Sequence, residues 1–479
     1  MASIWSKTTQ LEPRPALAGA IKTEVAVIGG GMAGVLTARL LEEQGVQAVV
    51  LEANRLGSGQ TGNTTAKLTA QHGLIYGRLT EQLGEDAARQ YAQINQRAIG
   101  AYWERAAAWR ADCQIRHAPA YLYSRTQEDP LREEAHAAVR LGLEASFTTD
   151  TELPFPVRGA VRLEGQAAFH PLQFLAAAAR GLTVYEHTRA VRVEGHLVET
   201  NGGRVEAEHI VFACHYPFVN APGYYFLRMH QERSYVVAVE HAARLEGLYY
   251  GVDPEGLSLR RAGELLLVGG ANHRTGDNQA GGRYEQLRRA GRGLWPESRE
   301  AAHWSAQDCM TLDGVPYIGP FSASTPHWYV ATGFGKWGMS TSMVSAMLLS
   351  DLITGRENPA APVFSPQRFH LAASARTLLE EGKRAAQGLG QAAFEPPRAV
   401  WEQLPAGHGG VVEWEDHKAG VYRDDEGEVW AVSVHCPHLG CQVEWNPDEK
   451  TWDCPCHGSR FDIRGRLISG PAQTDLARE

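Results

Sequence analysis

The sequence predicts an α/β nucleotide-binding domain, a strand-rich second domain and a small all-β domain at the C-terminus. Three observations support this organisation. Residues 24–52 follow a strand, glycine turn, helix and strand pattern, whereas residues 183–270 contain several short strand patterns. Beyond about residue 395 the chain consists of short strands and turns. A length of 479 residues is sufficient for two or three domains.

Composition excludes several classes of function. The chain is 43% hydrophobic and 21% charged, which is ordinary for a globular protein. A formal net charge of -9 argues against nucleic acid or an anionic membrane surface as the main partner. The sequence contains no apolar run long enough for a transmembrane helix, and residues 1–20 lack the apolar core of a secretory signal. We therefore expect a cytoplasmic protein with no membrane span.

The N-terminal segment has the pattern of a Rossmann-type βαβ unit. Residues 24–28 and 48–52 predict two strands, and residues 32–44 predict the helix between them. The motif G-x-G-x-x-G at 29–34 permits a tight turn and a close approach of the backbone to a pyrophosphate at the helix N-terminus. Glu52 ends the second strand, where a carboxylate can bind ribose hydroxyls. These features predict a dinucleotide-binding site, without distinguishing FAD from NAD.

The middle of the chain changes from helical patterns to strand patterns and then back to a helix. Residues 80–145 are rich in Ala, Glu and Arg with helical spacing, and a further helix is expected over 341–353. Strands are expected at 183–185, 190–193, 210–213 and 234–239. Residues 366–394 are predicted to form a helical linker, because prolines precede this segment and glycines and prolines end it. A separate domain is expected over 395–479.

Four of the seven cysteines lie within the C-terminal domain and predict an iron–sulfur site. Cys436-Pro-His438 is followed by Cys454-Pro-Cys-His457, an arrangement that suits a [2Fe–2S] cluster with thiolates on one iron and imidazoles on the other. A structural zinc site is the alternative, but its usual paired C-x2-4-C or C-x2-C and H-x3-5-H spacings are absent. The other cysteines are expected to be buried, small hydrophobic residues: Cys113, Cys214 and Cys309.

The C-terminal domain resembles the Rieske domains of respiratory complexes. That resemblance implies a disulfide between Cys441 and Cys456, and a hydrogen bond from Ser459 that raises the reduction potential of the cluster. It also implies that the proline loop at 470–472 covers the cluster. Related domains usually have tyrosine where this chain has Phe461, so we expect a lower potential than in the respiratory members.

Residues 20–365 resemble the glycine oxidase/D-amino-acid oxidase (DAO) family of FAD-dependent amine oxidoreductases. The resemblance implies FAD as cofactor and a p-hydroxybenzoate-hydroxylase-like fold, in which an antiparallel-sheet substrate domain accompanies the FAD-binding domain. The motifs that carry it are Glu52–Thr65, Ala190-Val191 with Ile210–Ala213, D-G-V-P-Y-I-G at 313–319 and T-G-F-G-K-W-G-M at 332–339. Within a first domain of residues 1–365 it implies FAD-binding segments at about 20–75, 165–220 and 305–360, and substrate-binding segments at about 76–164 and 221–304.

The late glycine loop at 332–339 has a physical rationale as a flavin contact. It leads into the predicted helix, so amide hydrogens and the positive helix dipole meet where a reduced flavin carries negative charge. Residues 64–73 differ from the Ser-x-x-Gly of simpler oxidases and should approach the isoalloxazine. The expected FAD contacts are Gly29, Gly31, Ala33, Gly34, Glu52, Ala53, Arg55, Thr61, Thr64, Thr65, Ala66, Val191, Gly333, Trp337, Gly338 and Met339.

The two resemblances together predict an amine or amino-acid dehydrogenase. Hydride transfer from the substrate α-carbon to flavin N5 would leave an imine that hydrolyses, and electrons would pass singly to the cluster and then to an external protein, quinone or oxygen. We favour a dehydrogenase over an oxidase, because a cluster beside the flavin has little use if oxygen reoxidises the flavin directly. The substrate-pocket candidates are His72, Lys336 and Trp337. Arg228 and Arg233 could clamp a carboxylate or form surface salt bridges.

Three other functions are compatible with parts of the pattern. A ring-hydroxylating oxygenase needs two histidines and a carboxylate on a mononuclear iron, for which Glu206, His209 and His215 come nearest. An NAD(P)H-dependent reductase would need a second G-x-G-x-x-G, which the sequence lacks. A non-enzymatic redox sensor or carrier would have no organic substrate that reduces the flavin quickly.

Overall fold

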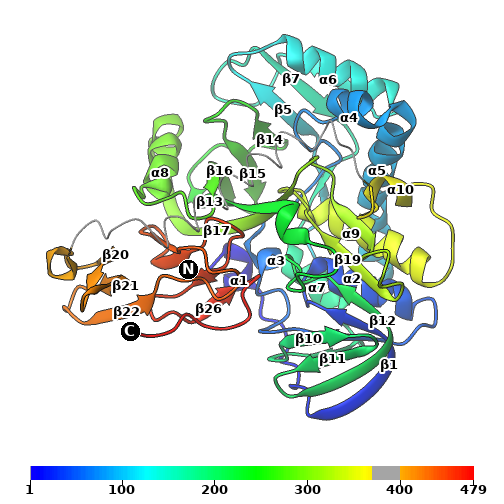
Figure 1. Ribbon diagram of the computed structural model, residues 1–479. Helices are drawn as coiled ribbons and strands as arrows, with labels where there is room; N and C mark the ends of the chain where they lie inside the picture. Colours follow the sequence, from blue (N-terminus) through cyan, green and yellow to red (C-terminus); the bar gives the residue numbers. More distant parts are fainter. Residues whose placement is uncertain (1, 369–399) are drawn as a thin grey trace.

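The computed structural model describes residues 2–368 and 400–479. In this part of the chain, two eight-stranded sheets form the larger body and two smaller sheets form the C-terminal domain (Figure 1). The fold class predicted from the sequence is confirmed. The predicted linker over 366–394 lies outside the described residues except for its first three positions.

The first sheet contains the predicted βαβ unit. Its strands run in the order β10-β11-β12-β1-β2-β9. Strand β19 pairs with the C-terminal end of β12, and β18 pairs with β19. The parallel strands are β1 (Gly19–Ile28), β2 (Ala48–Leu51), β9 (Thr183–Tyr185), β12 (Gly203–Phe212) and β19 (Trp328–Thr332). The antiparallel strands are β10 (Ala190–Glu194), β11 (Leu197–Thr200) and β18 (Tyr317–Pro320).

Helices α2 (Met32–Glu42) and α9 (Gly338–Ile353) pack against each other. Both are buried along most of their length, because their apolar residues join one continuous core. Helix α9 begins three residues earlier than predicted, so its N-terminus lies directly after the glycine loop. The other helical segments of the larger body are α1 (Ile4–Thr8), α3 (Gln60–Asn63), α4 (Tyr76–Leu83), α5 (Glu85–Ala108), α6 (Asp129–Arg140), α7 (Pro171–Ala178), η1 (Tyr225–Leu227), α8 (Arg283–Leu294) and α10 (Ala361–Phe364).

The second sheet is antiparallel except where β14 pairs with β5. Its order is β17 (Arg299–Thr311), β13 (Met229–Glu240), β16 (Leu265–Arg274), β15 (Ser258–Ala262), β14 (Leu248–Gly251), β5 (Ala120–Ser124), β7 (Gly159–Leu163) and β6 (Ala145–Thr148). The expectation of helix throughout 80–145 is therefore wrong at β5. All five of its residues are buried, and a continuous apolar run of this kind suits a central strand. A small sheet of β3 (Lys67–Leu68), β8 (Ala167–Ala168) and β4 (Arg116–His117) lies outside the two large ones.

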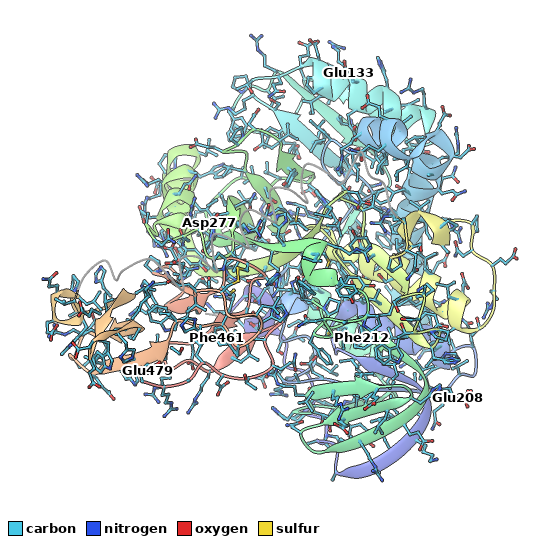
Figure 2. The ribbon with its side chains drawn as sticks, in the orientation of Figure 1. Glu133, Glu208, Phe212, Asp277, Phe461 and Glu479 are labelled. Atoms are coloured by element: carbon cyan, nitrogen blue, oxygen red, sulfur yellow. A yellow bond between two sulfur atoms is a disulfide. The ribbon has the colours of Figure 1, made fainter. Side chains whose placement is uncertain are left out.

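The C-terminal domain lies against β13, β17 and α8 of the larger body (Figure 1). After η2 (Trp401–Gln403), its sheets are β20 (His408–Trp414), β21 (His417–Arg423) and β22 (Val429–Ser433), and β23 (Glu444–Asn446), β24 (Thr451–Asp453), β25 (Arg460–Phe461) and β26 (Leu467–Ser469). Figure 2 labels Phe461 inside this domain and Phe212 at the end of β12. Across residues 2–368 and 400–479, no helix is long and apolar enough to cross a membrane.

Candidate functional site

A cavity of about 580 Å³ is bounded by all three parts of the molecule. Its walls include the loops after β1, β2, β12 and β19 and the inner faces of β13 to β16. The C-terminal domain completes it with Arg460, Ile468, Ser469, Gly470 and Gln473. A molecule bound between the first two domains would therefore also lie beside the C-terminal domain.

The glycine motif forms part of the wall of this cavity. Gly29 has φ +116°, and a Cβ there would lie 2.4 Å from the carbonyl oxygen of Ala213. A Cβ on Gly34 would lie 2.0 Å from the carbonyl oxygen of Gly29, so helix α2 can approach the end of β1 this closely only with glycine at position 34. The motif therefore leaves the space at the N-terminus of α2 open for a pyrophosphate.

Glu52 lies beside the same turn. Its carboxylate accepts hydrogen bonds from the backbone N–H groups of Gly30 at 2.7 Å and Asn54 at 2.8 Å. Burial raises the pKa of Glu52, although these two hydrogen bonds oppose the shift. The carboxylate is thus fixed at the cavity wall, where it can accept hydrogen bonds from ribose hydroxyls.

Most of the residues expected to bind the dinucleotide line the cavity, but four do not. The side chain of Arg55 turns away to the Leu11 carbonyl at 3.0 Å and to Glu186 at 3.7 Å. Val191 is 44% exposed, because alternation along β10 turns Ala190 inward instead. Gly34 and Ala66 are buried behind the wall. Those that line it are Gly29, Gly31, Ala33, Glu52, Ala53, Thr61, Thr64, Thr65, Gly333, Trp337, Gly338 and Met339.

The three substrate-pocket candidates occupy different positions. Trp337 lines the cavity and stacks on His72, with ring centroids 5.1 Å apart. His72 is buried behind it, bonded through Nδ1 to the hydroxyl of Tyr91 at 2.6 Å, and it does not line the cavity. Burial lowers the pKa of His72 to about 3, so the ring is neutral. This geometry places His72 behind Trp337 rather than on the cavity wall.

Lys336 lines the cavity as a cation. Its Nζ lies 3.0 Å from Glu232 and 3.2 Å from the hydroxyl of Ser234. Burial alone would lower the pKa of Lys336, but the charges of Asp308 and Glu232 raise it. The backbone of Lys336 is left-handed, with φ +73°, which is how the glycine loop turns into α9. Positive charge therefore faces the space that the late glycine loop encloses.

Neither arginine considered as a carboxylate clamp lines the cavity. Arg228 packs on the rings of Tyr225 and Tyr317 and donates to the carbonyl of Gly223. Arg233 is fully buried and pairs with Glu449 of the C-terminal domain at 2.9 Å. Arg233 is thus a domain contact rather than the surface ion pair expected.

Two loops of the C-terminal domain have the same backbone pattern. In residues 436–441 the N–H of Cys436 donates to the Cys441 carbonyl, and the N–H of Gly440 donates to the Cys436 carbonyl. In residues 454–459 the same bonds join Cys454 with Ser459, and Gly458 with Cys454. Each loop therefore presents one buried cysteine and one histidine, and the predicted disulfide between Cys441 and Cys456 ties the loops together.

The four predicted ligands meet between these loops. The thiols of Cys436 and Cys454 are hydrogen-bonded, and this bond lowers the pKa of Cys436 to about 7. The rings of His438 and His457 are 4.8 Å apart and nearly perpendicular. Among the residues that the structure describes, both Nδ1 atoms are buried without a hydrogen-bond partner, and burial keeps both rings neutral. Two neutral imidazole nitrogens and two thiols are the donor set that a Rieske [2Fe–2S] cluster requires.

The outer nitrogens of these histidines face the larger body. His438 Nε2 lies 2.8 Å from Asn220 Oδ1, and His457 bonds to the backbone of Phe226. Because an amide oxygen accepts, His438 carries its proton on Nε2 and leaves Nδ1 free for a metal. The loop before β13 thus covers the histidine side of the cluster site.

Comparison with known proteins agrees with both sites. The sequence matches the family of FAD dependent oxidoreductases (DAO) over residues 24–352 and the Rieske [2Fe-2S] domain over residues 397–478. The chain belongs to the DAO family of FAD dependent oxidoreductases. This DAO-family protein carries FAD and a Rieske [2Fe–2S] cluster. It is 36% identical to YhfW of Bacillus subtilis (strain 168), whose name refers to a Rieske 2Fe-2S iron-sulfur protein, over 98% of this chain and 95% of that one.

Solved structures show the same fold in the larger body of this DAO-family protein. L-proline dehydrogenase from P. horikoshii superposes with a TM-score of 0.62 at 16% identity, over 74% of this chain and 99% of that one. Glycine oxidase from Geobacillus kaustophilus superposes with a TM-score of 0.61 at 21% identity, over 73% of this chain and 99% of that one. At these identities the likeness concerns the fold alone.

The oxygenase arrangement is not formed. Glu206 pairs with Lys22 on the exposed side of β1 and β12, whereas His209 packs beside His327. His215 lines the cavity. Within residues 2–368 and 400–479, these side chains do not form a group that could hold a metal.

We predict that Ser459→Ala lowers the reduction potential of the cluster by roughly 60–120 mV. The Ser459 hydroxyl accepts from the N–H of Ala472 at 2.9 Å and bonds to the Cys436 sulfur. Hydrogen bonds to charged groups contribute about 1.5–3 kcal/mol, and for a one-electron couple 59 mV corresponds to about 1.4 kcal/mol. A spectroelectrochemical titration measures the shift. Ser433→Ala, outside the two cluster loops, is the control.

Proposed function

We propose that this protein is a dehydrogenase that oxidises the C–N bond of an amine or amino acid and delivers the electrons through its own Rieske cluster to an external acceptor. The observation that carries the proposal is the single cavity that extends from the dinucleotide-binding turn to residues of the C-terminal domain. When bound, the flavin would accept a hydride from the substrate carbon, and the cluster would take electrons one at a time.

The cavity walls support this chemistry. Trp337 meets Tyr250 edge to face at 5.2 Å, so two aromatic rings enclose the space beside the flavin-binding loop and exclude water. Lys336 and the N-terminus of α9 place positive charge where reduction adds negative charge. Positioning and desolvation are the chief requirements for hydride transfer from a neutral amine.

The contacts between the domains support transfer to the cluster. Gln231 of β13 donates to the carbonyl of His457 at 2.5 Å, and Gln307 of β17 donates to the carbonyl of Gly458 at 2.8 Å. Gln307 also bonds to Gln231, so the two amides hold a cluster loop on the sheet that lines the cavity. This contact holds the cluster loop in place beside the cavity, which supports electron transfer between the two redox sites.

An anaerobic titration tests the proposal. Purified protein is mixed with glycine, sarcosine, L-proline, D-alanine or putrescine, while the flavin absorbance and the EPR signal of the reduced cluster are followed together. We expect at least one amine to bleach the flavin and to produce the cluster signal. Bleaching by NADH and by none of the amines would favour a reductase instead. Rapid oxygen consumption with stoichiometric peroxide, unchanged in His457→Ala, would contradict a dehydrogenase.

A further inference from the structure

Lys67 is a cavity-lining amine that the proposed mechanism has not used. It follows Thr64 and Thr65 and lies on the short strand β3, where 9% of its surface is exposed. Its Nζ donates a hydrogen bond to the hydroxyl of Ser258 on β15, which also lines the cavity. Lys67 therefore joins the flavin-binding segment to the substrate-domain sheet at the cavity wall.

The surroundings of Lys67 do not provide a counter-charge. In the described part of the chain no carboxylate pairs with it, and the charged group that acts on it is Arg260. Arg260 is itself buried and donates to the carbonyls of Thr65, Ala66 and Phe169. A buried ammonium beside a buried guanidinium is unfavourable, so the neutral amine is the form that this site stabilises.

Neighbouring groups leave this conclusion unchanged. His170 at the start of α7 is neutral, because burial lowers its pKa to about 4. The other charged side chains on the cavity wall are Glu52, Arg189, Asp308, Lys336 and Arg460. Among them, Lys336 pairs with Asp308 and also with Glu232. Burial, reinforced by the charge of Arg260, lowers the pKa of Lys67 to about 7.

We propose that Lys67 is the catalytic base that removes a proton from the ammonium group of the substrate. This proposal deepens the proposed function and rests on it. An N–H bond of the substrate ammonium breaks and a bond from that hydrogen to Lys67 Nζ forms. With the flavin bound, the freed lone pair would then form C=N as the hydride left the α-carbon with its electron pair for the flavin. Lys67 returns its proton to water, and Ser258 holds Nζ in place throughout.

A requirement for such a base follows from the chemistry of amines. At neutral pH most amine and amino-acid substrates are protonated, since their amino groups have pKa values of about 8 to 10. Hydride can leave only from the neutral amine, because its lone pair must form the double bond. The neutral amine of Lys67 lines the cavity and is a base of matching strength for this proton.

The first test needs no substrate. The holoenzyme is labelled with trace acetic anhydride from pH 5.5 to 10, and acetylation of each lysine is measured by mass spectrometry against a free lysine derivative of ordinary pKa, about 10.4. We expect the reactivity of Lys67 to rise with a midpoint near pH 7. A midpoint close to that of the free derivative would overturn the base role while leaving the proposed function intact.

The second test measures flavin reduction in the stopped flow with the amine that bleaches the wild-type flavin fastest. Lys67→Met should slow reduction about 100-fold at pH 7, and the rate should recover above the pKa of the substrate amine. Wild-type reduction should slow as pH falls below 7, and this limb should be absent in the variant. FAD content confirms that each variant is folded, and exposed Lys22→Met is the control.

Lys67→Arg separates a base from a cationic anchor. Arginine keeps a positive charge but cannot accept a proton at these pH values, so a base role predicts that reduction stays slow at pH 7. Reduction at the wild-type rate in Lys67→Arg would overturn the proposal and indicate binding of a substrate carboxylate. If none of the probe amines bleaches the wild-type flavin, the proposed function fails and the base role fails with it.

Discussion

Cys454→Ser is expected to remove the Rieske cluster and to stop electron delivery while FAD remains bound. Cys454 is 1% exposed and its thiol meets that of Cys436 between the two cluster loops. A serine oxygen is a harder and more basic ligand, which iron–sulfur clusters seldom accept. We expect amine-dependent reduction of cytochrome c to fall at least about 100-fold, since loss even of outer partners of a metal site costs roughly 10–100-fold.

The measurement combines three readouts on the same sample: iron content, the EPR signal after reduction with dithionite, and flavin absorbance. The matched control is Cys113→Ser, which makes the same chemical change at a buried cysteine of the larger body. Cytochrome c reduction that persists in Cys454→Ser without the EPR signal would contradict the cluster as the outlet. It would show that electrons leave directly from the flavin.

Features that depend on residues close together in the sequence were predictable. The ligands Cys436 and His438 are two positions apart, and Cys454 and His457 are three apart, so chemistry and spacing define the site before any folding. The turn at 29–34 is recognisable from an equally local pattern, although Gly29 is also required by its close approach to Ala213. The all-β character of the C-terminal domain follows from similarly local signals.

Features that depend on contacts across the fold were not predictable. His72 is adjacent to flavin-binding residues in sequence, yet its ring lies behind Trp337. Lys67 was part of a segment expected near the isoalloxazine, but its contact with Ser258 comes from a strand about 190 residues away. The alternation along β10 offers the one signal that could have moved the expected contact from Val191 to Ala190.

Docking of the C-terminal domain is the largest of these long-range features. The Glu449 carboxylate forms an ion pair with the buried Arg233 at 2.9 Å. It also accepts hydrogen bonds from the hydroxyls of Tyr284 at 2.6 Å and Ser305 at 2.7 Å. Burial would raise the pKa of Glu449, but the charges of Arg233 and Arg460 lower it, so the carboxylate is ionised. Glu449 thus joins the two domains, because it binds Arg460 of its own domain and Arg233 of the larger body.

Glu449→Leu is therefore expected to destabilise the docked C-terminal domain by about 3–5 kcal/mol, because it leaves the Arg233 guanidinium buried without its carboxylate. Denaturant unfolding followed by the visible circular dichroism of the cluster measures the change. Flavin fluorescence follows the larger body separately, since a chain of several domains need not unfold in one step. Transfer from flavin to cluster should slow in the same variant, because the cluster loop loses its fixed position.

The double variant Arg233→Met/Glu449→Leu distinguishes loss of the pair from loss of packing. Replacing both partners by apolar side chains removes the unpaired charge, so most of the stability should return. Lys22→Met, which breaks the exposed pair with Glu206, should change stability by no more than about 0.5 kcal/mol. If the double variant is as unstable as Glu449→Leu, the buried pair is not what holds the domains together. The amide contacts of Gln231 and Gln307 would then carry the docking.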